Sequence, residues 1–266
     1  MALIGTLTSG VSALRTFSKG LEVIGNNISN VNTTAYKSSA ASYGDTFSNT
    51  LRAATSASGD SAIQVGTGVQ ITGISTNYTQ GSLASTGSGT DLAVSGEGYF
   101  IVRDPSGRNY ATRDGAFKFD NDGYLINGLG YRVLDNAGAA VQVTDYSQKA
   151  SVTIGSNGVI TVFESDGTSA AGQTVGLLRF SDQGKLMKSG NNLFDFSSTG
   201  ANVATAMVAP GSDGVGTIQT GRLEMSNVDL TEQFSELITT QRSFQAGSRL
   251  ITVSDSVLED IVNLKR

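Results

Sequence analysis

Residues 6–30 read TLTSGVSALRTFSKGLEVIGNNISN, and an apolar side chain recurs in them at every seventh position. The recurring residues are Leu7, Leu14, Leu21 and Ile28, and a companion stripe holds Leu3, Phe17, Ile24 and Val31. A seven-residue period is typical of a helix that packs against another helix. We therefore predict a helix from about Thr6 to Asn30, although its internal glycines each cost about 1 kcal/mol relative to Ala in an isolated helix.

The other end of the chain carries the same period. Its apolar positions are Leu230, Leu237, Phe244, Ile251 and Leu258. Asn227 or Asp229 is suited to cap the start of this second helix. Helices confined to opposite termini indicate that the ends meet and that the middle is an inserted module. An ordinary intramolecular helix pair is the alternative, but the N-terminal apolar residues occupy two adjacent stripes, which favours several partner helices.

The composition excludes much of enzyme chemistry. The 266 residues include no Cys, His or Trp, and so lack most zinc ligands, thiol nucleophiles and neutral-pH general bases. Charged residues make up 15% of the chain and the net charge is -5, so we expect neither nucleic acid nor a membrane as a partner. No signal peptide or membrane span is expected from the sequence. We expect no enzyme activity, no cofactor and no metal.

Between the two helices the pattern changes to many short strands. From about Leu83 to Ile218, turn signals such as Asn121-Asp122-Gly123 recur every 8 to 15 residues between short apolar runs, as in an all-β domain. Residues 65–78 alternate as a strand or hairpin arm, and residues 46–68 look like an extended connector. We predict an α+β fold with three parts: a terminal helical coiled-coil domain (1–36 and 225–266), an extended connector or β-hairpin (37–80) and a β-rich outer domain (81–224).

Two glycine-containing segments resemble ligand loops, and both are better interpreted as turns. Gly96-Glu97-Gly98 precedes a strand-like run, whereas a phosphate loop must lead into a helix. Asp120-Asn121-Asp122-Gly123 resembles the start of a calcium loop, but Tyr131 stands where that loop needs a Glu. We therefore predict a hairpin turn at Gly123 with a positive φ.

Four passages resemble the family of bacterial flagellar rod and hook proteins. The first runs from Leu21 to Lys37 and is similar to the "ANNLANxxTxGFK" string of that family. The second and third, at 91–100 and 110–117, resemble its "G-x-G-F-F" strand and its "YTRxGxF" motif. The fourth joins residues 226–230 to 240–245 and resembles its C-terminal helix. The family-motif residues are Asn26, Asn27, Asn30, Gly96, Gly98, Phe100, Arg113, Gly115, Asn227, Gln241 and Arg242.

The resemblance implies a structural subunit of a tubular homopolymer in the flagellar hook and basal body. It further implies other axial, cap and junction proteins as partners, and passage through the flagellar type III export apparatus without a cleaved signal peptide. The C-terminal run is most similar to hook proteins, so we expect a short hook protein. The distal rod protein is the alternative, because the length is near that of rod proteins and residues 49–64 resemble a distal-rod insertion.

The polymer contacts are expected to lie on the terminal stripes. The residues predicted for this interface are Leu7, Val11, Leu14, Phe17, Leu21, Ile24, Ile28, Val31, Leu230, Phe234, Leu237, Phe244, Ile251 and Leu258. A more distant alternative is a β-rich secreted adhesin or enzyme with helical ends that form a discrete oligomer.

Overall fold

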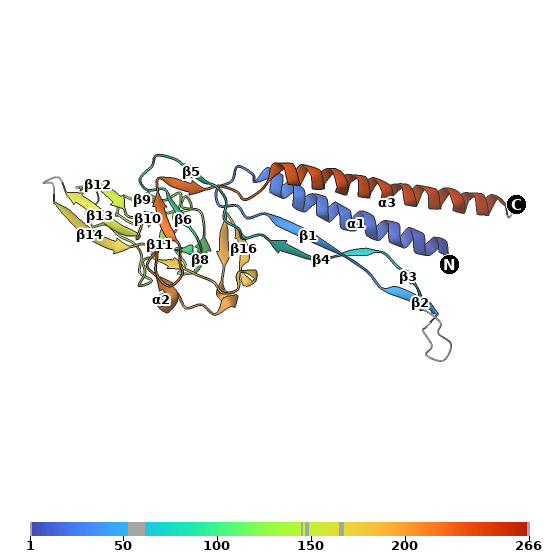
Figure 1. Ribbon diagram of the computed structural model, residues 1–266, viewed down its shortest axis with the longest axis horizontal. Helices are drawn as coiled ribbons and strands as arrows, with labels where there is room; N and C mark the ends of the chain where they lie inside the picture. The colour runs from blue at the N-terminus through green and yellow to red at the C-terminus, as the bar shows by residue number, and fades with distance from the viewer. Residues whose placement is uncertain (1, 53–61, 145, 147–148, 165–167, 265–266) are drawn as a thin grey trace. The chain divides into compact units, whose positions relative to one another are not determined.

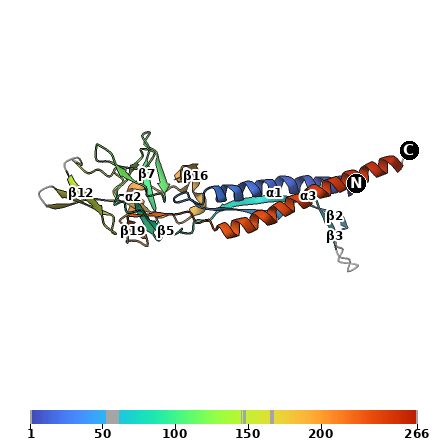
Figure 2. The same cartoon turned by 90° about the horizontal axis from the view of Figure 1, so that it is seen from above.

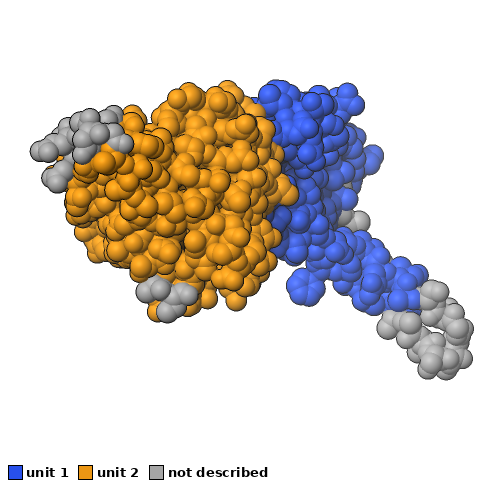
Figure 3. Space-filling view, turned by 60° about the vertical axis from the view of Figure 1, so that its left-hand side comes forward, with its two compact units in different colours: residues 1–30, 38–77, 228–266 blue, residues 31–37, 78–227 orange. Residues whose placement is uncertain are grey.

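The computed structural model describes residues 2–52, 62–144, 146, 149–164 and 168–264. The chain divides into two compact units, coloured blue and orange in Figure 3. Unit 1 consists of residues 1–30, 38–77 and 228–266, and unit 2 of residues 31–37 and 78–227. The prediction of helices at both ends and a β-rich middle, an α+β fold, is confirmed.

Unit 1 contains the two long helices and an arm of paired antiparallel strands. Helix α1 spans Ala2–Ser29 and α3 spans Leu230–Leu264. They lie side by side in Figures 1 and 2. Of the two predicted N-caps for α3, Asp229 is the one used, because its Oδ1 accepts from the backbone N–H of Thr231 at 2.8 Å. The side chain of Asn227 donates instead to the carbonyl of Thr79.

The arm is built from four antiparallel strands in two pairs. Strand β1 (Ser39–Asp45) pairs with β4 (Val69–Thr76), and β2 (Ser48–Arg52) pairs with β3 (Ile63–Gly66). Strands β1 and β4 lie against α1 in unit 1, where Thr16 Oγ1 donates to the carbonyl of Val69 at 3.0 Å. The segment predicted as an extended connector or β-hairpin at 37–80 thus contains paired antiparallel strands, and its residues 38–77 group with the helices in unit 1. The low-complexity stretch at 53–60 lies outside the described residues.

The strands of unit 2 begin with β5 to β11, which follow one another in short steps. Their bounds are Leu83–Ser85 (β5), Leu92–Ser95 (β6), Tyr99–Arg103 (β7), Asn109–Thr112 (β8), Lys118–Phe119 (β9), Leu125–Ile126 (β10) and Arg132–Val133 (β11). Strand β7 is buried over Tyr99–Val102 and pairs with β8 and β11. The predicted turn at Gly123 joins β9 to β10 with a φ of 78°, which confirms the hairpin interpretation.

A three-stranded meander and several shorter strands complete unit 2. The meander holds Lys149–Ile154 (β12), Val159–Glu164 (β13) and Ser169–Thr174 (β14). The remaining strands are Leu177–Leu178 (β15), Met187–Gly190 (β16), Leu193–Asp195 (β17), Met207–Val208 (β18), Thr217–Thr220 (β19) and Arg222–Glu224 (β20). The strands are interrupted by a four-residue helix, α2 (Val203–Ala206), and by short 3-10 turns at 183–185 and 197–199. The sequence pattern did not predict this helix or these turns.

Apolar side chains from these strands form two clusters in unit 2. Phe100, Val102, Leu125 and Ile218 belong to the larger cluster, and Phe100 contacts Phe117 edge to face with ring centres 5.2 Å apart. Tyr99, Ile101 and Phe194 belong to the smaller cluster. Alternate residues of β7 thus face different clusters, as the two-residue period of a strand requires. Unit 2 therefore has a buried core of its own.

Candidate functional site

The helix pair of unit 1 is joined through a row of small and polar side chains on α3. The row repeats every seven residues, and its members are the buried residues of that helix, Gln233, Thr240, Gly247 and Ser254. Thr6 Oγ1 lies 3.3 Å from Ser254 Oγ, and Asn27 Nδ2 donates to Gln233 Oε1 at 2.8 Å, so the two helices are antiparallel. The predicted seven-residue period is present on α3. However, the residues that are buried along it are small or polar, and they are not the predicted apolar residues.

The predicted apolar residues fall into three classes of burial. Ile24 is buried. The half-buried ones are Leu7, Leu14, Phe17, Leu21, Ile28, Val31, Leu237, Phe244, Ile251 and Leu258. Val11, Leu230 and Phe234 are exposed. Val31 belongs to unit 2, and the side chain of Leu3 lies outside the description. The small and polar row was not predicted, although its seven-residue spacing is present in the sequence.

Two of the four glycines in α1, Gly10 and Gly20, have a packing role that the sequence pattern did not indicate. A Cβ at Gly10 would lie 2.9 Å from Cγ1 of Ile251, and one at Gly20 would overlap the hydroxyl of Tyr43. A Cβ at Gly25 would have no neighbour within 4 Å. Gly10 therefore permits the close approach of α3, and Gly20 that of β1, so the glycines do more than weaken the helix.

The contrast between Gly25 and Gly10 gives a matched test. We expect Gly25→Ala to stabilise unit 1 by about 0.5–1 kcal/mol, because Ala loses less backbone entropy than Gly in a helix. Gly10→Ala should gain less or lose stability, because Ile251 must move to admit the new methyl group. Urea unfolding followed by the helical circular dichroism signal measures both. Equal gains at the two positions would contradict this account of Gly10.

A second face of α3 exposes large apolar side chains. Leu250, Val253, Val257, Ile261 and Leu264 follow one another at spacings of three or four residues, which places them on one side of the helix. All five are exposed, with Val253 60% and Leu264 86% accessible. Large apolar residues gathered on one face are typical of a protein contact surface.

The asparagines of the first motif hold the end of α1. Asn27 is buried, and its Nδ2 donates to the carbonyl of Ser39 at 2.8 Å while its Oδ1 accepts from the Ser39 N–H at 3.0 Å. Asn30 Nδ2 donates to the carbonyl of Asn26 at 2.9 Å, and its backbone N–H donates to the same carbonyl. Asn27 therefore links α1 to β1 and α3, whereas Asn26 and Asn30 terminate α1 locally.

Unit 2 contains a buried ionic cluster of Lys37, Arg113 and Glu224, which we call the Glu224 cluster. Lys37 Nζ lies 2.6 Å from Glu224 Oε1, and Arg113 Nη1 lies 3.4 Å from Glu224 Oε2. All three side chains are at most 4% exposed. Burial lowers the pKa of Lys37, and the Glu224 carboxylate opposes that shift. The sequence analysis marked Arg113 through the family motif, but it did not predict Glu224.

The other motif residues of unit 2 shape the surroundings of Arg113. Arg113 Nη2 donates to the carbonyl of Gly96 at 2.9 Å. Gly96 and Gly98 have φ values of 109° and 132°, which favour glycine, and they form the turn that leads into β7. A Cβ at Gly115 would overlap the carbonyl of Leu92. These glycines have a structural role in the strand turns, as predicted for Gly96 and Gly98.

Tyr99 lies against the same arginine and gives a prediction for alkaline pH. The Arg113 guanidinium is 4.9 Å from the Tyr99 ring centre, and burial raises the pKa of Tyr99 to about 12. The pKa of Tyr99 in the folded chain thus lies above its value of about 10 in the unfolded chain. The neutral Tyr99 therefore makes its full contribution to the free energy of unfolding below pH 10, and this contribution is lost between about pH 10 and 12. In Tyr99→Phe this part of the alkaline destabilisation should disappear.

The same variant should keep the stability of the parent near neutral pH. Among the described residues, the Tyr99 hydroxyl is buried without a hydrogen-bond partner, so removing it leaves no new polar group unsatisfied. Urea unfolding across pH 7 to 12 measures both effects. A variant with an unchanged alkaline profile would refute the assignment of this titration to Tyr99.

The C-terminal motif residues are not brought together at one site. Asn227 lies in unit 2, where its backbone N–H donates to the carbonyl of Tyr36 at 3.3 Å and its side chain donates to Thr79. Gln241 and Arg242 are exposed on α3 in unit 1. Their positions on the outside of the helix leave them available to contact another molecule.

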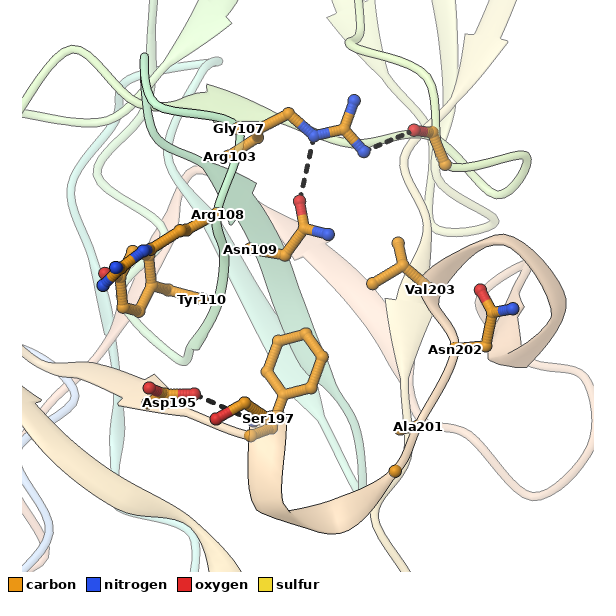
Figure 4. A pocket seen from close by; sticks show the side chains of 13 residues that line it. Arg103, Gly107, Arg108, Asn109, Tyr110, Asp195, Ser197, Ala201, Asn202 and Val203 are labelled. Carbon is orange, nitrogen blue, oxygen red and sulfur yellow. Dashed lines mark hydrogen bonds between the residues drawn. The ribbon is translucent and has the colours of Figure 1, made fainter.

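Unit 2 also has an open pocket of about 900 Å³, shown in Figure 4. Its polar lining residues bind one another: Arg103 donates to the Asn109 side chain at 2.9 Å and to the carbonyl of Gly138 at 3.1 Å. Asp195 accepts from the Ser197 backbone N–H at 2.8 Å. These contacts fix the turns around the pocket. We therefore interpret the polar residues that line it as structural residues that hold the strands together.

The described residues of the chain offer neither a metal site nor a membrane-spanning helix. No group of three or more Asp or Glu side chains there is close enough to hold a metal ion. Within the same residues, none of the helices has the length and apolarity needed for a membrane span. The features that stand out are therefore the helix pair, the apolar face of α3 and the Glu224 cluster.

Comparison with protein families gives matches in three parts of the chain. Residues 7–37 match the flagella basal body rod protein family, and residues 93–162 match the flagellar hook protein FlgE/F/G D1 domain. Residues 219–264 match the flagellar basal body rod FlgEFG protein C-terminal family. The matched regions contain residues 7–29 of α1, all of α3, the Asn27–Gln233 pair and the contacts of Arg113 with Gly96 and Glu224.

Similar proteins extend the match to the whole chain. The flagellar basal-body rod protein FlgG of Bacillus subtilis is 39% identical over 99% of this chain and 100% of its own length. The protein of the same name from Borreliella burgdorferi is 34% identical over 100% of this chain and 99% of its own. FlgF of Caulobacter vibrioides, also named a flagellar basal-body rod protein, is 32% identical over 91% of this chain and 90% of its own. These relatives carry rod names, which agree with the rod alternative of the sequence analysis and not with the hook.

Proposed function

Because the chain belongs to the FlgE/F/G family of flagellar hook and basal-body rod proteins, a family of structural subunits, we propose that it is a subunit of the distal rod. The observation that carries this proposal is the match to FlgG over the full length of both chains. Its relatives are structural rod proteins and not enzymes, and the family places the protein in the flagellum.

Polymerisation through the terminal helices is the mechanism that we propose. The helix pair of unit 1 buries few large apolar residues, while Leu250, Val253 and Val257 are exposed on α3. Covering such side chains contributes about 25 cal/mol for each Å² of apolar surface removed from water. A neighbouring subunit that covers this face would extend the α1–α3 pair into a larger coiled-coil packing, as the seven-residue period favours.

The remaining contacts of the subunit follow from the same proposal. Unit 2 has its own core and would form the outer part of a tubular homopolymer, with weaker and more polar contacts between copies. Other axial proteins, including cap and junction proteins, would meet the two ends of the tube. The flagellar type III apparatus would export the subunit without cleavage of a signal peptide.

Electron microscopy of the purified chain at rising concentration tests the proposal. A distal rod subunit should form straight, open-ended tubes. Discrete closed oligomers would contradict the proposal and favour a secreted adhesin with helical ends. The measurement needs no flagellar partner, because the proposed contact joins copies of this chain.

The hook protein is the second candidate, and it rests on the similarity of the C-terminal passages at 227–234, 240–246 and 262–266 to hook proteins. The same images separate it from the rod, because a hook subunit should form curved tubes. The rod ranks first because FlgG relatives match along the entire chain, whereas the hook similarity rests on the C-terminal segment.

A further inference from the structure

The seven-residue repeat of the terminal helices does not by itself fix how they are aligned. Gly10 of α1 faces Ile251, which has a large apolar residue seven positions away on each side, Phe244 and Leu258. A slip of one helix along the other by seven residues would therefore place a similar residue opposite Gly10. Apolar repeats of this kind supply affinity but leave neighbouring alignments close in energy.

The amide contact between Asn27 and Gln233 in the helix pair is not repeated seven residues away. Asn27 Nδ2 donates to Gln233 Oε1 at 2.8 Å, and both side chains are buried. Seven residues further along α3 stands Thr240, whose short hydroxyl side chain replaces the long amide. A slip would separate Asn27 from Gln233. Their amide groups would then be buried without the hydrogen bond between them, which costs free energy.

Asn27 is also fixed to the arm, so it cannot follow a slipped α3. Its amide makes two hydrogen bonds to the backbone of Ser39, one as donor at 2.8 Å and one as acceptor at 3.0 Å. The Gln233 partner therefore meets an amide whose position and orientation are already set. A single buried polar residue is known to select the alignment of paired helices by this mechanism.

We propose that the buried pair Asn27–Gln233 determines the register in which α1 and α3 associate. The apolar repeat supplies the attraction, and the amide pair rejects the alignments displaced by seven residues. The proposal concerns one chain and does not require the polymer. It gives Asn27 a specificity-determining role and explains why an amide occupies a buried position of α1.

Pairs of introduced cysteines can report the register, because the chain has no cysteine of its own. Thr6→Cys with Ser254→Cys reports the observed register, since the two hydroxyl oxygens are 3.3 Å apart. Thr6→Cys with Ile261→Cys, and Ala13→Cys with Thr240→Cys, report slips of seven residues in the two directions. Disulfide formation is measured on the monomer separated by size-exclusion chromatography, so that bonds between chains do not contribute.

In the parent background we expect the native pair to form at least about tenfold more disulfide than either slipped pair. Asn27→Leu with Gln233→Leu should raise the disulfide yield of the slipped pairs to within about twofold of the yield of the native pair, because no buried amide pair then favours one register. The matched control, Asn26→Leu with Gln241→Leu, changes the same residue types at exposed positions of the same helices and should keep the native preference.

Two results would overturn the proposal. One is continued exclusion of the slipped pairs when Asn27 and Gln233 are both Leu. The other is equal yield of all three disulfides in the parent chain. If the double variant loses its helical circular dichroism, Gln233→Leu alone repeats the test while keeping the Asn27–Ser39 hydrogen bonds. Absence of tubes in the microscope would refute the rod proposal and leave these yields unaffected.

Discussion

Glu224→Gln should destabilise unit 2 by about 3–5 kcal/mol, the usual cost of removing one partner from a buried ion pair. The carboxylate accepts from Lys37 Nζ at 2.6 Å and from the Gly81 N–H at 3.0 Å, and it faces Arg113 at 3.4 Å. Without its negative charge, two buried cations are left with no anion between them. The glutamine keeps the size of the side chain, so the loss reports the charge and not a cavity.

Glu164→Gln is the matched control in the same unit. Glu164 binds Lys149 at the same distance of 2.6 Å, but its side chain is 42% exposed. An ion pair open to water contributes at most about 1 kcal/mol, so the control should change stability little. Urea unfolding of the full chain followed by near-ultraviolet circular dichroism suits the comparison, because all the tyrosines except Tyr43 belong to unit 2. Equal losses in the two variants would contradict the role given to burial.

Val253→Asp should abolish tube formation while the free subunit stays folded. Val253 is 60% exposed on the apolar face of α3, so an aspartate there stays in water in the monomer. Val and Asp have similar helix propensities, and exposed substitutions usually change stability by less than about 0.5 kcal/mol. In the proposed polymer the same carboxylate would be buried in an apolar contact, which costs far more than the contact can gain.

Sedimentation and electron microscopy measure the polymer, and far-ultraviolet circular dichroism measures the fold of the monomer. We expect sedimentable protein to fall at least about tenfold in Val253→Asp, the factor that corresponds to 1.4 kcal/mol per contact. Ser248→Asp adds the same charge at an exposed position on the opposite side of α3 and should leave assembly intact. Normal tubes from the Val253 variant would show that this face is not the subunit contact.

Much of the fold could be predicted because the signals are local. The period of Leu7, Leu14 and Leu21 marks a helix within a few turns of chain, and turns such as that at Gly123 mark strands in the same way. The residues of the candidate site were harder to predict from the sequence. The apolar period includes Ile251 and Leu258 but not Gly247 and Ser254, because small and polar residues carry no apolar signal even where they form a helix contact.

The placement of residues 38–77 shows the limit of composition as a guide. The Ser, Thr and Gly content of residues 46–68 indicated a connector, yet β2 and β3 pair within this stretch, and the predicted strand at 65–78 packs on α1 through contacts such as Thr16 to Val69. Small and polar side chains allow two backbones to approach closely and supply hydrogen bonds. Composition alone does not say whether such a segment is free or packed.

The sequence by itself determined that helices occupy both ends, that strands fill the middle and that catalysis by His or Cys is absent, since each depends on residue type or short-range period. Only the tertiary structure decided which residues meet. Lys37 and Glu224 are 187 positions apart, and Asn27 and Gln233 are 206 apart. No local pattern encodes these pairs, because their free energy comes from burial together, which exists only after the whole chain has folded.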